Sequence, residues 1–376
     1  MCHDSNCHYN SHRRKKKVKE TNKPLGLHKE HKEKDDTLLK PQTQIPTDNT
    51  NLQVKLVTYS QNTSGVESKN TSNVPDSVWV TGAATLWNLG FEGNGVRVGV
   101  IDTGIDNSHP ALQSKVIKRR DYVRDRRATS SYNPHGTHVA GTIAANFSGL
   151  KGVAPKALLL DYRVLDVNGS GTFANVTQAV IDAVNDGCHI INMSLGSSYS
   201  HTPLHKAIQY AVSKNVLVVV AAGNEGANRI SYPAGYPEVV SVGAVQFDPV
   251  HGNVIVPQTP WFSNTNPQVD ICADGWQTFS CVPGNKYAAY SGTSMATPLL
   301  SGFAALMRCL LIAKMKRAPT EPELYAVLRS NAIEVNTLLK TNPNLQGSGF
   351  LTVFHEIPKK VNGVWVLPSL LQTAPN

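Results

Sequence analysis

Cysteine is scarce in this sequence, and long apolar runs are absent. Six cysteines in 376 residues are too few for a disulfide scaffold. No window is apolar over the length that a membrane span requires, and residues 1–30 lack the apolar core of a secretory signal. The sequence therefore predicts no transmembrane segment and, as written, an intracellular protein; secretion would need a leader that is incomplete here or unconventional.

The cysteines leave one question open. Cys188 and Cys309 lie in apolar contexts typical of buried free thiols. Cys272 and Cys281 are spaced like a local disulfide, but spacing does not fix connectivity, and the compartment does not follow from the sequence. A bridge and two free thiols both stay open at this point.

The N-terminal segment is basic and poor in packing signals. The formal net charge is +9, and the first fifty residues hold eleven Lys and Arg against seven Asp and Glu. Residues 1–73 have no sustained hydrophobic periodicity, so we expect a disordered leader. The basic run at residues 13–17 could touch nucleic acid or anionic lipid, but most such runs are solvated. We expect no nucleic-acid partner beyond non-specific contact of this tail.

From about residue 74 the pattern becomes that of a folded domain, which we place at residues 74–356, with a tail at 357–376. Apolar runs rich in Val, Ile and Leu alternate with helical stripes. The predicted strands lie at 96–101, 158–165, 189–193, 216–222 and 239–245, and the predicted helices at 173–184, 202–212, 299–313 and 320–332. This alternation predicts an α/β fold with a doubly wound, mostly parallel, twisted sheet and helices on both faces.

Titratable side chains stand where such a sheet places its sites, at the carboxyl ends of the strands. Asp102 ends the first strand, so we expect its carboxylate to be heavily hydrogen-bonded or to face a cationic group. His135 precedes a helix of small residues and is a better candidate base than His138, which lies within that helix. A His-x-x-His metal pair is the alternative, but no third ligand is evident.

Asn224 and Ser294 add an amide and a hydroxyl. Ser294 stands at the head of the apolar helix, where Gly292 permits a sharp turn and free backbone N–H groups would face an oxyanion. Taken alone, Asn224 would be a turn residue and Ser294 a helix cap. Taken together, carboxylate, imidazole, amide and hydroxyl supply the orienting group, base, oxyanion donor and nucleophile of acyl transfer.

From about residue 74 to residue 353 the sequence resembles the subtilisin-like serine peptidases. The resemblance rests on three boxes: Val-Ile-Asp-Thr-Gly-Ile-Asp at 100–106, His-Gly-Thr-His-Val-Ala-Gly-Thr at 135–142 and Gly-Thr-Ser-Met-Ala-Thr-Pro at 292–298. It implies a serine endopeptidase that works through an acyl-enzyme intermediate. By the resemblance, Asp102, His135 and Ser294 form the catalytic triad, and Asn224 is the oxyanion-hole side chain.

The resemblance also implies how a substrate binds. Two segments match those that pair with an extended peptide as added strands, and they contain Gly169, Ser170, Gly171, Ser194, Leu195 and Gly196. Such binding depends first on hydrogen bonds to the peptide's main chain and only second on its side chains. We therefore expect protein or peptide substrates, broad specificity and a monomeric enzyme.

Departures from the family pattern concern calcium and one strand end. Calcium-binding relatives place an aspartate where this sequence has Ala111, and the loop at 145–152 looks shortened. Calcium stays open as a cofactor, but we expect its usual strong site to be lost, and we predict no metal ligand. Asp274 stands where relatives usually carry proline.

Two rival functions remain beside the peptidase. An esterase or transferase would use the same acyl-enzyme chemistry. An inactive scaffold would use the fold alone, with the basic tail as an anchor to nucleic acid or membrane. The four chemical groups argue against the scaffold, because binding does not require all of them.

Overall fold

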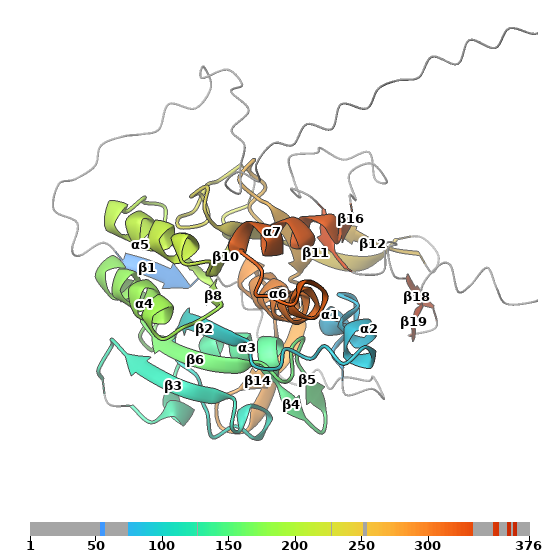
Figure 1. The fold of residues 1–376 in the computed structure, drawn as a ribbon, viewed down its shortest axis with the longest axis horizontal. Helices are drawn as coiled ribbons and strands as arrows, with labels where there is room; N and C mark the ends of the chain where they lie inside the picture. The colour runs from blue at the N-terminus through green and yellow to red at the C-terminus, as the bar shows by residue number, and fades with distance from the viewer. Residues whose placement is uncertain are drawn as a thin grey trace, which may run out of the picture.

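One large sheet organises the fold (Figure 1). The computed structural model describes residues 53–56, 74–125, 127–226, 228–250, 254–333, 349–352, 359–361 and 364–366. Within them, eight parallel strands lie in the order β17-β13-β11-β10-β8-β2-β6-β3. Their bounds are β2 Arg97–Asp102, β3 Val116–Asp121, β6 Leu158–Arg163, β8 Ile190–Met193, β10 Leu217–Ala221, β11 Val240–Val250, β13 Ile271–Asp274 and β17 Phe350–Leu351. This confirms the predicted fold class.

Helices cover both faces of the sheet and bury two apolar cores. One core holds side chains of α3 (Pro134–Ala144), α6 (Thr293–Met315) and α7 (Glu321–Ser330). The other holds side chains of α4 (Phe173–Asn185) and α5 (Thr202–Ser213). In β2, Val100 belongs to the first core and its neighbour Ile101 to the second, as the two-residue period of a strand requires. All four predicted helices are confirmed.

The central helix α6 is long and apolar enough to cross a membrane. Of its most apolar 18-residue stretch, 72% is buried inside the described part of the chain. The helix packs against β8, β10, β11, β13 and α3. A Cβ atom at Gly302 would lie 2.6 Å from Cβ of Val153, so the helix needs glycine there to approach its neighbour. The apolarity of α6 is therefore that of a core helix.

Smaller elements surround this core. They are α1 Asp76–Trp79, α2 Ala83–Asn88, β4 Asn146–Phe147, β5 Leu150–Lys151, β7 Ser170–Thr172, β9 Leu195–Gly196, β12 Val254–Gln258, β14 Thr278–Val282, β15 Lys286–Tyr290, β16 Ala332–Ile333, β18 Lys359–Val361 and β19 Val364–Val366. The antiparallel hairpin β14–β15 leads directly into α6. Two short 3-10 turns, Pro110–Leu112 and Thr129–Ser131, flank β3.

The five predicted strands are confirmed, but three of the eight parallel strands, β3, β13 and β17, were not predicted. β3 carries Lys118, Arg119 and Arg120 in succession, so it lacks the apolar run of a buried strand. It lies at the edge of the sheet, where charged residues are common. β13 has three apolar residues before Asp274, and β17 has only two residues in all, so neither shows a sustained apolar run.

The cysteine question is answered in favour of free thiols. Cys188, Cys272, Cys281 and Cys309 are all free. The first three are buried, and Cys309 is partly exposed. Burial raises the pKa of Cys272 and of Cys281 to about 12, so both thiols stay protonated and unreactive.

The described part of the expected disordered leader, residues 53–56, is a strand. β1 (Gln53–Leu56) pairs antiparallel with β7 and with β9. The expectation of disorder across residues 1–73 therefore fails for these four residues, because a single strand takes its hydrogen bonds from partners that local composition does not reveal. Residues 1–52 and 57–73 lie outside the described residues, as do residues 353–358, 362–363 and 367–376 around the expected C-terminal tail.

Asp274 ends β13 with a buried carboxyl group. Its Oδ1 accepts a hydrogen bond from the backbone N–H of Trp276 at 3.1 Å. Burial raises the pKa of Asp274 from 3.8 to about 7, and the Asp76 carboxylate adds to the rise. The native fold thus disfavours the charged form of this group.

We expect the Asp274→Asn variant to be more stable than the native chain at pH 8.5 and nearly equal to it at pH 4. Because the pKa in the folded state lies above 3.8, the native stability tied to this group is complete below about pH 4 and is lost as the pH rises through 7. Asparagine stays neutral and still accepts the Trp276 N–H. The gain should be on the order of 2–4 kcal/mol at pH 8.5, measured by thermal unfolding in a Ser294→Ala background. Equal gains at both pH values would contradict this account.

Candidate active site

Asp102 and His135 form a direct pair. Asp102 ends β2 and is fully buried. Its Oδ1 accepts hydrogen bonds from the Thr103 backbone N–H at 2.7 Å and from His135 Nδ1 at 2.7 Å. The position after an apolar strand predicts such partners for Oδ1, whereas Oδ2 is buried without a hydrogen-bond partner among the described residues.

The pair fixes the tautomer of His135. A carboxylate only accepts, so Nδ1 must carry the proton, and Nε2 of the neutral ring is then unprotonated. Among the described residues, Nε2 is buried and has no hydrogen-bond partner. A basic nitrogen held in this way is what a general base requires.

Thr103 and Asn133 hold the two loops together. The Thr103 hydroxyl donates to the Asn133 carbonyl at 3.0 Å and accepts from the Gly136 N–H at 2.9 Å. Asn133 caps α3, because its side chain accepts the His135 N–H at 3.0 Å. A Cβ atom at Gly136 would lie 2.5 Å from the Gly104 carbonyl oxygen, so only glycine permits this approach.

His138 makes structural contacts to the β14–β15 hairpin and is not placed as a metal ligand among the described residues. Its Nε2 donates to the carbonyls of Thr278 and Ala288, at 3.0 and 3.2 Å, and its ring stacks on Tyr290. Burial lowers the pKa of His138 to about 3, so the ring stays neutral and ties α3 to the β14–β15 hairpin. In the described ranges, no three His, Cys, Asp or Glu side chains gather as metal ligands.

Ser294 is the second residue of α6 and is fully buried. Its hydroxyl donates to the Ser194 carbonyl at 3.1 Å, and the Ser194 hydroxyl donates to the Ser294 carbonyl at 3.0 Å. The N-cap of α6 is Gly292, so the alternative of Ser294 as a helix cap is wrong. Since His135 Nε2 has no partner among the described residues, the structure contains no bond from it to the Ser294 hydroxyl.

Asn224 lies against the start of α6. Its Oδ1 accepts from both the backbone N–H and the hydroxyl of Thr293, each at 2.9 Å. A backbone N–H only donates, so this contact distinguishes the amide oxygen from the amide nitrogen. The NH₂ group, which is the donor needed for an oxyanion, therefore lies on the other arm of the side chain.

The predicted substrate segments lie in β7 and β9 or next to them. Ser170 and Gly171 belong to β7, and Leu195 and Gly196 form β9. Gly169 and Ser194 directly precede these strands. β1 lies between the two, with Lys55 opposite both Ser170 and Gly196. These segments therefore do accept an added strand, and in this structure the strand is the chain's own.

Sequence reasoning missed the polar residues that support the site. Asn192 donates to the Ser194 hydroxyl at 3.1 Å and accepts from Ser301 at 2.8 Å, all in the buried core. The signal was a lone asparagine inside the apolar run at 189–193. Thr103 and Thr293 had no such signal, because a threonine next to a catalytic candidate within a box is not distinguishable from a spacer.

A doubly wound sheet with a carboxylate–imidazole pair after one strand and a buried serine at the start of the central helix is the arrangement of serine hydrolases with an α/β fold. The model of the subtilase family of peptidases matches residues 93–349, which include the three boxes and the strands between them. The chain therefore belongs to the subtilase family, and it is a serine endopeptidase.

Similar proteins of known name agree with this. An intracellular serine protease of Paenibacillus polymyxa is 42% identical over 301 residues, covering 77% of this chain and 88% of the relative. The major intracellular serine protease of Bacillus subtilis is 38% identical over 80% of this chain and 93% of its own length. Subtilisin Savinase of Lederbergia lenta is 41% identical over 63% of this chain and 84% of its own length.

We expect Thr103→Val to lower kcat about tenfold or more while Thr103→Ser keeps most of it. Valine has the shape of threonine but leaves the Gly136 N–H without its acceptor, a loss of about 1–3 kcal/mol at a buried site. The measurement is kcat on a peptide substrate with active sites titrated. If Thr103→Val kept native kcat, the hydroxyl would not hold these loops in register.

Proposed function

We propose that Asp102, His135 and Ser294 form a catalytic triad for peptide-bond hydrolysis. The observation that carries this is the 2.7 Å contact between His135 Nδ1 and Asp102 Oδ1, which leaves Nε2 as the basic atom. In the triad, the Ser294 hydroxyl would donate to Nε2 in place of the Ser194 carbonyl that accepts it here.

The chemistry then follows the roles of these atoms. Ser294 Oγ bonds to the scissile carbonyl carbon as its proton passes to His135 Nε2, and Asp102 stabilises the imidazolium. The carbonyl oxygen becomes an oxyanion, which accepts hydrogen bonds from the Asn224 NH₂ group and the Ser294 N–H. The C–N bond breaks as Nε2 returns its proton to the leaving amine, and water hydrolyses the acyl-enzyme by the same steps.

Substrate would bind as an extended strand between β7 and β9, in the place that β1 takes here. The antiparallel register of β1 on both neighbours supports this mode. Main-chain hydrogen bonds do not depend on the side chains of the bound peptide, so we propose broad specificity. Because residues 53–56 fill the groove, the same pairing would also restrain the enzyme's own activity.

The residues present do not fit a calcium ion at the position that relatives use. Ala111 is buried in a 3-10 turn. Residues 145–152 form the short β4–β5 hairpin and contain no carboxylate. The hairpin carries Lys151, whose ammonium lies 3.4 Å from Glu92. We propose that this loop holds no calcium.

Location and assembly are also proposals. Two relatives are named intracellular proteases, which supports action inside the cell. We propose a monomer, since the proposed catalytic groups and substrate strands all come from one chain. Esterase or transferase activity remains the rival chemistry at the same atoms.

We expect Ser294→Ala to abolish both casein hydrolysis and labelling by a fluorophosphonate probe. The probe bonds to an activated serine, so the two signals should disappear together. The assay compares native and variant protein on unfolded casein and on the probe. Labelling without peptide release would point to other acyl chemistry, and neither signal in the native protein would favour the scaffold.

We expect Lys55→Pro to raise the apparent affinity for peptide substrates. Proline lacks the N–H and cannot sit in a paired inner strand, so β1 should leave the groove. A tethered strand competes at an effective concentration on the order of millimolar, so KM should fall several-fold. Thr63→Pro, outside the strand, is the control. An unchanged KM would mean that β1 does not compete with substrate.

A further inference from the structure

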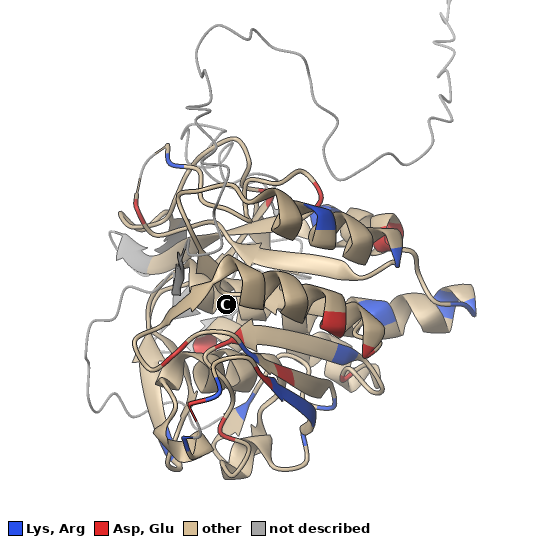
Figure 2. Cartoon of the chain, turned by 90° about the vertical axis from the view of Figure 1, so that its left-hand side faces the viewer, with Lys and Arg blue, Asp and Glu red and all other residues tan. Residues whose placement is uncertain are grey.

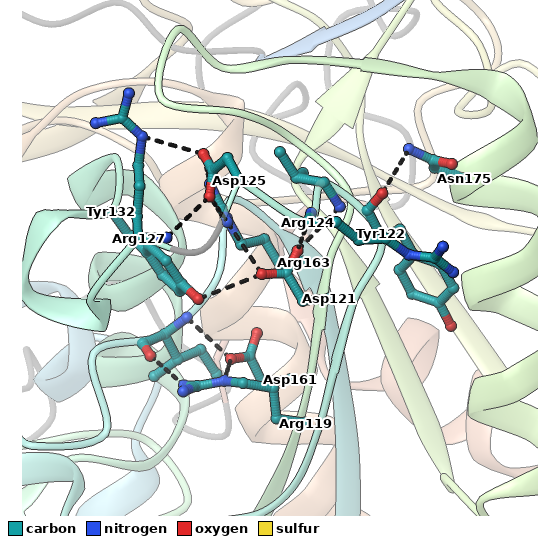
Figure 3. Close-up of polar contacts among 12 residues, drawn as sticks. Arg119, Asp121, Tyr122, Arg124, Asp125, Arg127, Tyr132, Asp161, Arg163 and Asn175 are labelled. Carbon is teal, nitrogen blue, oxygen red and sulfur yellow. Dashed lines mark hydrogen bonds and ion pairs between the residues drawn. The ribbon is translucent and has the colours of Figure 1, made fainter.

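The loop that follows Asp102 is clamped by an ion pair from two neighbouring strands. Asp161 on β6 accepts from Arg119 Nε on β3 at 2.7 Å. The same oxygen of Asp161 accepts the Ile105 backbone N–H at 3.2 Å, and the Arg119 guanidinium donates to the Ile105 carbonyl. Both backbone groups of Ile105 are thus held by one carboxylate–guanidinium pair, Asp161 and Arg119, whose own contact is drawn in Figure 3.

A second ion pair lies beside the first. Arg163 ends β6 and is fully buried. Its guanidinium makes two hydrogen bonds with Asp125, at 2.6 and 2.7 Å, and one with Asp121 at 3.0 Å. It lies 4.1 Å from the centre of the Tyr132 ring, and Arg119 faces the same ring at 5.8 Å (Figure 3).

Tyr132 connects this charged cluster to both members of the proposed catalytic pair. A Cβ atom at Gly104 would lie 2.6 Å from the ring, so the loop after Asp102 packs directly under it. Tyr132 also precedes Asn133, the residue that caps the His135 helix. The backbone after Arg163 then donates to the Asp102 carbonyl, from Val164 at 2.9 Å and Leu165 at 3.2 Å.

We propose that Arg119 and Asp161 are positioning residues that set the Asp102 loop against His135 in the catalytic geometry. The proposal rests on the proposed triad. Neither side chain touches the reacting atoms; both act through the backbone of Ile105. A guanidinium fork suits this task because its donors reach the carboxylate and the carbonyl in one fixed plane.

Burial explains why the pair has to be complete. The Asp161 side chain is fully buried, and burial raises its pKa to about 6 although Arg119 lowers it. An ionised carboxylate at this site therefore depends on its cation. Figure 2 shows acidic and basic segments side by side in the lower part of the domain.

The test uses Arg119→Gln and Asp161→Asn in the full chain, with Arg120→Gln as the matched control. Arg120 is the next residue of β3 and forms its ion pair with Asp186 at 2.8 Å, away from the Asp102 loop. Each variant is measured for kcat, KM and thermal midpoint. The proton resonance of His135 Nδ1–H, shared with Asp102, is recorded by NMR for each.

We expect both variants to lower kcat on the order of 10- to 100-fold, since a small misplacement of catalytic groups reduces the rate by this much. KM should stay within about twofold of the native value. The double variant should be no slower than the slower single one, because both changes open the same clamp. The His135 resonance should broaden or disappear in all three. Arg120→Gln should leave kcat and the resonance unchanged.

A lower thermal midpoint with native kcat and a native resonance would overturn the proposal and leave the pair a structural role. Rescue of kcat by Arg119→Lys would also overturn it, because lysine keeps the charge but not the fork. If Arg119→Gln does not fold, Asp161→Asn decides, as it keeps an acceptor for the Ile105 N–H. If the native protein failed to hydrolyse peptide, the proposed function would be wrong. The His135 resonance would still test whether the Asp161–Arg119 pair positions the Asp102 loop.

Discussion

The hydrogen bond between Asp102 and His135 is the contact on which the rest of the site depends. A carboxylate buried at the end of β2 is tolerable only with strong partners, and one of them comes from a different loop. To reach 2.7 Å, the backbones after β2 and at the start of α3 must almost touch. Gly136 permits that approach, and the Thr103 hydroxyl satisfies the backbone groups that face each other there.

The sequence predicted the elements whose physics is local. Buried parallel strands read as unbroken apolar runs, which is why β2, β6, β8, β10 and β11 were found. The three boxes were identified because a polar residue at the end of a buried apolar strand is costly unless it has a partner or a function. β3 and β1 were missed, since one is a charged edge strand and the other gains its hydrogen bonds only from distant partners. The Ser294–Ser194 contact was equally out of reach, because it joins residues one hundred positions apart.

β1 shows that β7 and β9 together pair with an added strand. β7 and β9 offer backbone groups, and backbone groups do not distinguish a foreign peptide from residues 53–56. Gly171 cannot carry a side chain without meeting the Val164 carbonyl oxygen, so this part of β7 presents main chain alone. Under the proposed substrate mode, broad substrate tolerance and occupation by the enzyme's own strand would have the same cause.

Asp161 and Asp274 show that burial alone does not decide what a carboxyl group does. Burial raises the pKa of both, to about 6 and about 7. Asp161 faces a guanidinium and can hold its geometry while ionised, whereas Asp274 has the Asp76 carboxylate as its charged neighbour. A group of the first kind can fix a loop throughout the range in which a neutral histidine acts as base. A group of the second kind lowers the stability of the fold as the pH rises through its pKa.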